Sequence, residues 1–136
     1  MGKILAVDYG AKRVGLAITD ELNIIATPLD TVPSNEIYIF LESLFQKEKI
    51  TTLVIGDPKN LKNEDTDITK AANTFASNVK KKFPFIEVAR VDERFTSKMA
   101  FQAMLDGGMK KKDRRKKENI DKISATIILQ SYLETI

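Results

Sequence analysis

The 136-residue chain contains neither cysteine nor histidine. These absences exclude disulfides, thiolate nucleophiles, Cys/His zinc sites, Ser-His-Asp triads and imidazole general bases. Any bound metal must therefore be held by oxygen ligands, which favours Mg²⁺ or Mn²⁺ over Zn²⁺. Acid–base chemistry falls to carboxylates, lysines, tyrosines or water polarised by a metal.

Long apolar runs, internal repeats and low-complexity tails are also missing. No apolar stretch approaches the length that spans a bilayer, and the first residues carry no signal-peptide pattern. We therefore expect a cytoplasmic protein with no membrane association. The hydrophobic fraction of 43% and the charged fraction of 30% are typical of globular chains. The length predicts a single domain over residues 1–136.

Positive charge is only slightly in excess, with 22 basic residues against 19 acidic ones, but it is unevenly placed. The run from Lys110 to Lys117 holds seven basic residues and one acid, Asp113. Such a run is often a solvated loop. It is equally suited to contact a nucleic-acid backbone, because clustered Lys and Arg release counterions from phosphates. The run alone does not decide between these interpretations.

Hydrophobic patterning predicts nine elements in the order β-β-β-α-β-α-β-α-α. The strands are expected near 4–7, 14–20, 23–29, 52–56 and 85–91, and the helices near 35–49, 68–83, 96–106 and 120–133. Short connections make the first three strands antiparallel, and the intervening helices make the later strands parallel. The prediction is an α/β fold with a mixed five-stranded sheet, helices on both faces and strand 52–56 at its centre.

Individual residues refine this prediction. Pro28 removes a backbone donor, which places the third strand at an edge or near its own end. Ser34 is the expected N-cap of the first helix. In the second strand, Val14, Leu16 and Ile18 share one face. Gly15 and Ala17 leave the other face open to the close approach of a helix, a backbone or a substrate.

Acidic residues far apart in the sequence are predicted to meet at one edge of the sheet. Asp8 ends the first strand, the Asp92-Glu93 pair ends the fifth, and Asp121 lies in the first turn of the last helix. Ligands of open α/β sheets gather at the carboxyl ends of strands, and we expect these two strands to be close enough to be neighbours. Three carboxylates there can hold two divalent cations about 3.5–4 Å apart, which activate water and stabilise a leaving oxygen in phosphodiester hydrolysis.

Each acid also has an ordinary structural interpretation. Asp8 can start a turn by bonding its own backbone, and Glu93 can pair with Arg94 or Arg90 at the surface. Asp121 can be a favourable charge at a helix N-terminus. Strand alternation puts Asp92 and Glu93 on opposite faces without showing which one faces the site.

The chain resembles the YqgF-type family of the ribonuclease H-like superfamily, whose members are described as Holliday-junction resolvases and as nucleases that mature pre-16S ribosomal RNA. The resemblance covers nearly the whole chain and is carried by Asp8-Tyr9-Gly10-Ala11-Lys12-Arg13-Val14-Gly15-Leu16-Ala17, Gly56-Asp57-Pro58, Asp92-Glu93-Arg94-Phe95-Thr96-Ser97 and the stretch from Asp121 to Leu133. It implies a ribonuclease H-like fold in which Asp8, Glu93 and Asp121 form a metal-binding acidic triad. It also implies that Glu93 rather than Asp92 is the ligand, and that Arg13 contacts phosphate.

Three positions depart from the family pattern. Asp57 stands where a hydrophobic residue is usual, Ser97 replaces a threonine, and Ser124 replaces the first of two alanines. None of these changes removes a triad acid, so the implied catalytic set is intact.

The leading hypothesis is a Mg²⁺- or Mn²⁺-dependent nuclease, with two metal ions, that processes the 5′ end of pre-16S rRNA. Phosphate contacts position a backbone without reading its sequence, so selectivity would come from the shape of the nucleic acid. The candidate nucleic-acid-binding residues are basic, and they are Arg13, Arg94, Lys98, Lys110, Lys111, Lys112, Arg114 and Arg115.

Three alternatives remain open. A Holliday-junction resolvase would need two active sites and hence a two-fold homodimer, whereas an RNA nuclease can act as a monomer. A non-catalytic RNA-binding factor in ribosome assembly would keep the fold without cleavage. An actin- or sugar-kinase-like ATPase also uses an Asp-x-Gly hairpin, but it encloses nucleotide between two lobes, which this length does not provide. The G-x-x-x-x-G-K-[ST] phosphate loop is absent as well.

Overall fold

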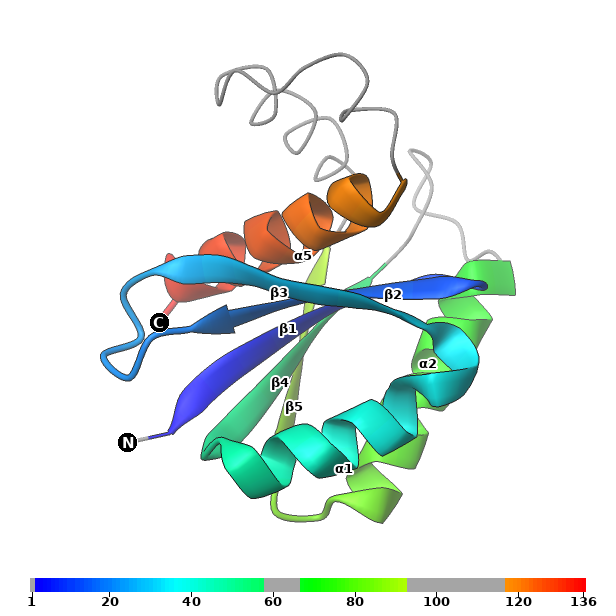
Figure 1. Ribbon diagram of the computed structural model, residues 1–136, viewed down its shortest axis with the longest axis horizontal. Helices are drawn as coiled ribbons and strands as arrows, with labels where there is room; N and C mark the ends of the chain where they lie inside the picture. Colours follow the sequence, from blue (N-terminus) through cyan, green and yellow to red (C-terminus); the bar gives the residue numbers. More distant parts are fainter. Residues whose placement is uncertain (1, 58–66, 93–116) are drawn as a thin grey trace.

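A computed structural model describes residues 2–57, 67–92 and 117–136. The described elements follow the predicted order (Figure 1), and they are β1 (Lys3–Tyr9), β2 (Arg13–Thr19), β3 (Ala26–Pro33), a 3₁₀ turn η1 (Ser34–Glu36), α1 (Ile37–Lys47), β4 (Ile50–Asp57), α2 (Asp67–Lys82), β5 (Glu87–Asp92) and α5 (Lys117–Leu133). The helix predicted near 96–106 lies outside the described residues.

The strands form a five-stranded mixed sheet in the order β3-β2-β1-β4-β5. β1 pairs antiparallel with β2 and β2 antiparallel with β3, whereas β4 runs parallel to both β1 and β5. The predicted mixed sheet is therefore confirmed, and so is the edge position of β3, the strand that contains Pro28. β4 lies inside the sheet but not at its centre, because β1 is the middle strand. One expectation was wrong: β1 and β5 are not neighbours, because β4 lies between them.

Helices cover both faces of the sheet, as predicted. α1 and α2 lie on one face, and α5 crosses the other (Figure 1). Side chains of β1, β2 and β4 alternate between two buried clusters, as expected of strands covered on both sides. On the α1–α2 side, Leu5 and Val7 of β1 pack with Leu16, Leu41 and Phe75.

The cluster beneath α5 is built from smaller side chains. Ala6 and Ala17 of the sheet meet Ala125, Ile128 and Leu129 of the helix, all of them buried. Small residues let the helix backbone approach the strands closely. The open face predicted from Gly15 and Ala17 is therefore occupied by a helix along most of its length.

The third strand was predicted at 23–29 but runs from Ala26 to Pro33. The Asp20 carboxylate accepts hydrogen bonds from the backbone N–H groups of Ile24, at 2.8 Å, and Ile25, at 3.0 Å, so these residues form a loop. These two bonds lower the pKa of Asp20, the bond from Ile25 having the larger effect. Pairing with β2 then carries the strand as far as Pro33, opposite Arg13.

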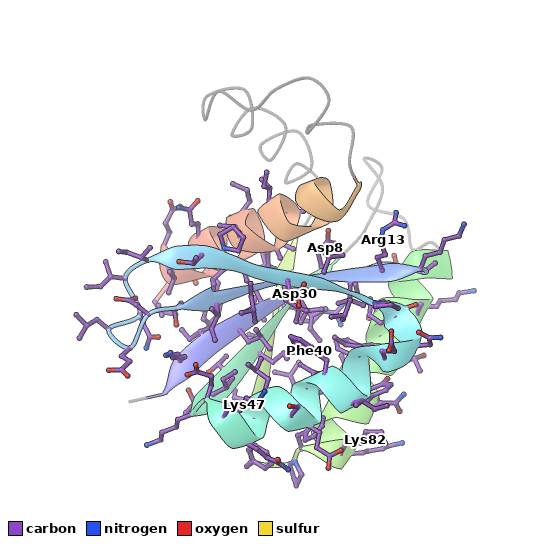
Figure 2. All side chains as sticks on the ribbon, viewed as in Figure 1. Asp8, Arg13, Asp30, Phe40, Lys47 and Lys82 are labelled. Carbon is purple, nitrogen blue, oxygen red and sulfur yellow. The ribbon has the colours of Figure 1, made fainter. Side chains whose placement is uncertain are left out.

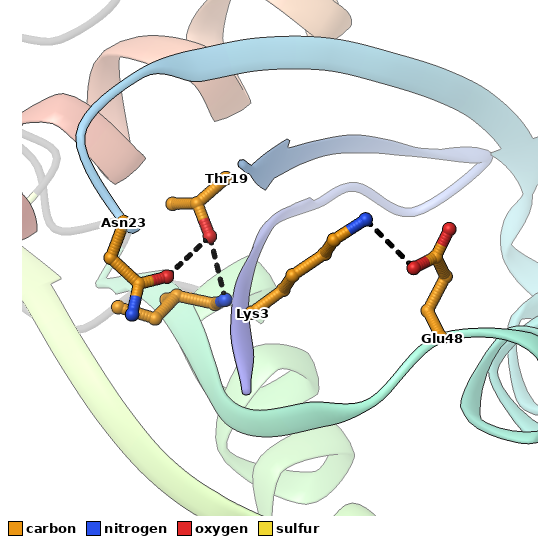
Figure 3. Close-up of polar contacts among 5 residues, drawn as sticks. Lys3, Thr19, Asn23 and Glu48 are labelled. Carbon is orange, nitrogen blue, oxygen red and sulfur yellow. Dashed lines mark hydrogen bonds and ion pairs between the residues drawn. The ribbon is translucent and has the colours of Figure 1, made fainter. Parts of the chain in front are cut away.

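This loop is tied to the start of β1 through a buried threonine (Figure 3). Thr19 Oγ1 accepts a hydrogen bond from the Ile4 backbone N–H at 2.9 Å and donates one to Asn23 Oδ1 at 2.7 Å. Asn23 Nδ2 donates in turn to the Gly2 carbonyl at 3.2 Å. Asn23 adopts a left-handed backbone conformation with φ of 57°, which asparagine tolerates better than most residues. The end of the sheet at which β1 begins is therefore a fixed structure.

The helix start predicted at Ser34 was also wrong. Ser34 begins the 3₁₀ turn, and its hydroxyl donates to the Ala11 carbonyl at 2.7 Å instead of capping the helix. Its backbone N–H donates to the Lys12 carbonyl at 2.9 Å. α1 begins only at Ile37 and ends at Lys47, two residues before the predicted end. Ser34 thus ties this region to the β1–β2 turn.

β4 and β5 also differ from their predicted bounds. β4 is longer than expected, running from Ile50 to Asp57, because β1 and β5 supply partners along it. β5 begins at Glu87, two residues late. The Ile86 N–H donates to the Phe83 carbonyl at 3.0 Å, which makes residues 83–86 a turn and leaves Phe85 exposed.

Candidate functional site

Asp8 lies near the carboxyl end of β1, on the face of the sheet that α5 covers. Ile4 and Ala6 of the same strand pack beneath α5, whereas Leu5 and Val7 face α1 and α2. Alternation therefore assigns Asp8 to the α5 side. Figure 2 shows its side chain pointing that way, and the residue is partly buried. A central strand of a five-stranded sheet holds this carboxylate on a rigid element.

Glycine flanks Asp8 in the sheet. Asp8 pairs with Gly15 of β2. On the other side, Val7 pairs with Ile55 of the parallel strand β4. The next residues of the two strands, Asp8 and Gly56, therefore lie side by side. Neither glycine places a side chain beside the carboxylate on the α5 face. Gly15 was expected to leave room, whereas Gly56 was expected only to end a strand, and its place beside Asp8 depends on the register between β1 and β4.

The hairpin after Asp8 is closed by backbone and anchored by an aromatic ring. The Gly10 N–H donates to the Arg13 carbonyl at 3.0 Å. A Cβ at Gly10 would lie 2.5 Å from that same oxygen, so the turn requires glycine. Tyr9 stacks on Phe75 of α2, with ring centroids 4.8 Å apart, and burial raises the pKa of Tyr9. The turn is therefore stabilised by this backbone hydrogen bond and this ring stack, and Asp8 is a residue of the strand.

Arg13 lies on the same side of the sheet as Asp8. It is the first residue of β2, and it shares the alternation of Gly15 and Ala17, whereas Val14 and Leu16 face α1 and α2. Arg13 is thus diagonal to Asp8, a relation that separates Cβ atoms by about 7–8 Å. Figure 2 shows both side chains on the α5 side. The structure therefore brings together two residues that sequence analysis had selected.

Asp121 lies in α5, but not in its first turn as expected. The helix begins at Lys117, so position 121 is one turn further in, and one turn before Ala125, which packs against the sheet. α5 starts above the end of β1 that carries Asp8 and runs back towards the strand's beginning (Figure 1).

The remaining predicted residues are Glu93, Arg94, Lys98, Lys110, Lys111, Lys112, Arg114 and Arg115, and they lie outside the described residues. β5 ends at Asp92, which pairs with Asp57 of β4, so its carboxyl end reaches the same edge of the sheet as that of β1. Ala89 and Val91 of β5 pack on the α5 side. Among the described residues, no three Asp, Glu, His or Cys side chains gather at one point.

A family model described as RuvX, Holliday junction resolvase, matches residues 2–135. The chain belongs to this family. A relative from Amoebophilus asiaticus is 49% identical over 135 residues, covering 99% of this chain and 96% of its own. One from Flavobacterium psychrophilum is 51% identical over 133 residues, covering 98% and 97%. Both are named provisionally as pre-16S rRNA nucleases.

The fold is also that of a solved resolvase. The structure of Thermus thermophilus RuvC in complex with a Holliday junction substrate aligns over 99% of this chain and 96% of that one, with a TM-score of 0.60 and 14% identity. At this identity the likeness shows the fold alone. The predicted ribonuclease H-like fold and the predicted membership of a nuclease and resolvase family are both confirmed. In the described part of the chain, no helix is both long and apolar enough to cross a membrane.

Proposed function

We propose that this member of the RuvX family is a metal-dependent nuclease that hydrolyses a phosphodiester bond in structured RNA, with Asp8, Glu93 and Asp121 as its catalytic acids. The supporting observation is the position of Asp8 at the carboxyl end of β1, with glycine on both neighbouring strands and Arg13 on the same face. A ligand that approaches the α5 face at this point meets a fixed carboxylate and a cation.

Three features favour the acidic triad as one site. β1 and β5 end at the same edge of the sheet, and α5 begins above it. The odd-numbered positions Ala89 and Val91 of β5 take the α5 side, and Glu93 is the next odd-numbered residue. This alternation favours Glu93 over Asp92, as the family resemblance does.

The donor set suits Mg²⁺ or Mn²⁺. Every donor would be a carboxylate oxygen, which hard divalent cations prefer, and the chain has no histidine or cysteine to attract softer metals. Gly15 and Gly56 are buried, and neither places a side chain beside Asp8 on the α5 face. Asp8, Glu93 and Asp121 would hold two such ions, which supply polarisation of the attacking water and of the leaving oxygen when bound.

The other residues of the chain position the substrate. Arg13, diagonal to Asp8, is suited to hold a phosphate of the scissile strand by paired hydrogen bonds. Arg94, Lys98, Lys110, Lys111, Lys112, Arg114 and Arg115 are the further candidates for phosphate contact. These contacts bind any phosphate backbone, so the shape of the RNA supplies the selectivity.

The provisional names of the relatives favour pre-16S rRNA as the substrate and the maturation of its 5′ end as the reaction. That role belongs to the cytoplasm, and one active site suffices for it, so a monomer can perform it. The description of the family favours a second candidate, cleavage of four-way DNA junctions. Symmetric cleavage of two strands at a junction needs two active sites and hence a two-fold homodimer.

The test compares cleavage of a labelled pre-16S rRNA fragment with that of a four-way DNA junction, each in Mg²⁺, Mn²⁺ and chelator. Wild type is run beside Asp8→Asn, which removes the charge and keeps the shape. Asp30→Asn is the matched control, because Asp30 is exposed on β3 and opposite Leu16 in the pairing of β3 with β2. We expect metal-dependent RNA cleavage in the wild type and the control, and none in Asp8→Asn.

The other outcomes separate the alternatives. Cleavage that survives Asp8→Asn means that the site is elsewhere. Cleavage of the junction alone, by a dimer, replaces RNA processing with the resolvase function. Tight RNA binding without cleavage in either metal identifies a non-catalytic assembly factor.

A further inference from the structure

A hollow of about 360 Å³ lies between α1 and α2, on the side of the sheet away from Asp8. It is lined by Tyr38, Ile39, Glu42, Lys82 and Phe83. Figure 2 shows Lys82 on α2, far along the molecule from Asp8 and Arg13. The size falls in the range of sites that bind small ligands. Nothing in the proposed catalytic mechanism uses this surface.

Tyr38 forms a fixed aromatic wall of the hollow. Its hydroxyl accepts a hydrogen bond from Asn78 Nδ2 at 3.0 Å, and its ring centroid lies 5.7 Å from that of Phe75. Lys82 Nζ stands 5.3 Å from the centroid of the Tyr38 ring, close enough for a cation–π attraction. A flat ring and a cation are therefore held together at one wall.

Phe85 presents a second aromatic ring, next to that of Phe83, which lines the hollow. It is 66% exposed, although its neighbours in the turn, Phe83 and Ile86, are buried. Phe83 and Phe45 approach its ring at 6.2 Å and 6.0 Å, with interplanar angles of 75° and 80°. Neither of these two rings stacks face to face on the Phe85 ring. The short turn therefore fixes a phenyl ring in solvent.

Positive charge lies along the last turn of α2, where Lys82 stands beside the Tyr38 ring. Lys80, Lys81 and Lys82 are exposed in the last turn of α2, while Glu42 is the acid at the hollow. The lysines also complement the helix dipole. That role explains neither the exposed Phe85 nor the hollow between the helices. Basic residues combined with exposed aromatic rings are the features that bind single-stranded nucleic acid.

We propose that this α1–α2 surface, formed by Tyr38, Glu42, Lys81, Lys82 and Phe85, binds a single-stranded segment of the RNA substrate. A base stacks on Phe85, the adjacent nucleotide enters the hollow beside Tyr38, and the lysines contact the phosphates. The Glu42 carboxylate accepts a hydrogen bond from an exocyclic amino group of the base. The lysines favour a polyanion over a protein partner.

This inference rests on the proposed function in taking RNA as the ligand, and it adds a second contact. β5 runs from the turn that holds Phe85 to the edge at which Asp92 ends, and six residues of strand span about 20 Å. An RNA that contacts both regions must also pass from one face of the sheet to the other. The surface therefore favours extended precursors over short products.

The test measures binding of an oligocytidine of about twelve nucleotides, by fluorescence anisotropy in chelator, so that no cleavage occurs. Phe85→Leu keeps an apolar side chain and removes the flat ring, and we expect about fivefold weaker binding or more. Lys82→Gln should lower the slope of log affinity against log salt by about 0.7. Lys70→Gln is its control, since Lys70 is exposed on the same helix about 18 Å away.

Binding is also mapped by amide chemical shifts of the labelled protein with the same oligocytidine. Shifts centred on Tyr38, Lys82 and Phe85, with unchanged melting temperatures of the variants, support the proposal. Unchanged affinity in both Phe85→Leu and Lys82→Gln overturns it. Loss of self-association in these variants, with RNA affinity unchanged, identifies a protein interface instead. Since no cleavage is measured, failure of the nuclease proposal leaves this result interpretable.

Discussion

At the scale of single residues, the glycines beside Asp8 matter as much as the acid. A carboxylate on a crowded sheet surface would have side chains of the neighbouring strands against it, whereas Asp8 has Gly15 on one side and Gly56 on the other. Glycine within a strand weakens the strand, because it loses more backbone entropy on folding and packs no side chain. These destabilising glycines lie at the position where we propose that metal ions and phosphate approach.

We therefore predict that Gly15→Ala raises stability and lowers activity. Alanine in this strand should stabilise the fold by about 0.5–1 kcal/mol, because the unfolded chain loses freedom. Its methyl group would stand beside Asp8 and displace the ligands there, and small displacements at a reacting centre cost about tenfold in rate or more. Urea denaturation and the rate of RNA cleavage measure the two effects. A loss of stability that accompanies the loss of activity would show that Gly15 is needed only for packing.

Sequence analysis selected Asp8 and Arg13 separately and did not predict that they share one face of the sheet. Both residues belong to one short hairpin, so that their relative placement follows from local sequence. The place of Gly56 depends on pairing between strands separated by a whole helix, which no local pattern specifies. Glu93 and the basic run from Lys110 to Lys117 lie outside the described residues and stay predictions.

At the scale of elements, prediction was accurate where a single periodic pattern decided the outcome. The apolar spacing in α2 predicted 68–83, and the helix runs from Asp67 to Lys82. Prediction was wrong where contacts with another part of the chain determine the bounds of an element. The bounds of β3 depend on its pairing with β2 and on the Asp20 loop. Ser34 is of a residue type that often caps a helix N-terminus, yet its hydroxyl donates a hydrogen bond to the β1–β2 turn.

The contact between β1 and α2 supports the position of Asp8. Tyr9 follows Asp8 directly and stacks on Phe75, so the end of the strand is braced against the helix. We predict that Tyr9→Ala costs about 2–4 kcal/mol of stability and also lowers kcat, whereas Tyr9→Phe keeps the stack and both properties. Phe40→Ala is the control, because it removes another partly buried ring from the same core. A kcat loss no larger than that of Phe40→Ala would mean that the Tyr9 stack does not position Asp8.

At the scale of the whole molecule, the proposed catalytic acids and the lysines at the end of α2 lie on opposite sides of the sheet. The α5 side carries Asp8 at its edge, and α5 itself contributes position 121, so the proposed site is acidic before metal binds. The α1–α2 side carries Lys80, Lys81 and Lys82. Sequence analysis predicted helices on both faces, but it did not predict that Asp8 and these three lysines lie on opposite sides, since strand order and helix placement decide that division.

This division predicts how RNA binding responds to charge at the site. Without divalent ions, the Asp8 carboxylate repels phosphate, so Asp8→Asn should bind RNA several-fold more tightly than wild type in chelator at low salt. The gap should narrow as salt shortens the screening length from about 10 Å at 0.1 M to about 3 Å at 1 M. In Mg²⁺ the order should reverse, because the wild type alone keeps a complete set of ligands for the cation. Anisotropy titrations of a pre-16S rRNA fragment at several salt concentrations, with Ca²⁺ replacing Mg²⁺ where cleavage interferes, measure all three comparisons. Equal affinities in chelator at low salt would show that the bound RNA does not pass over Asp8.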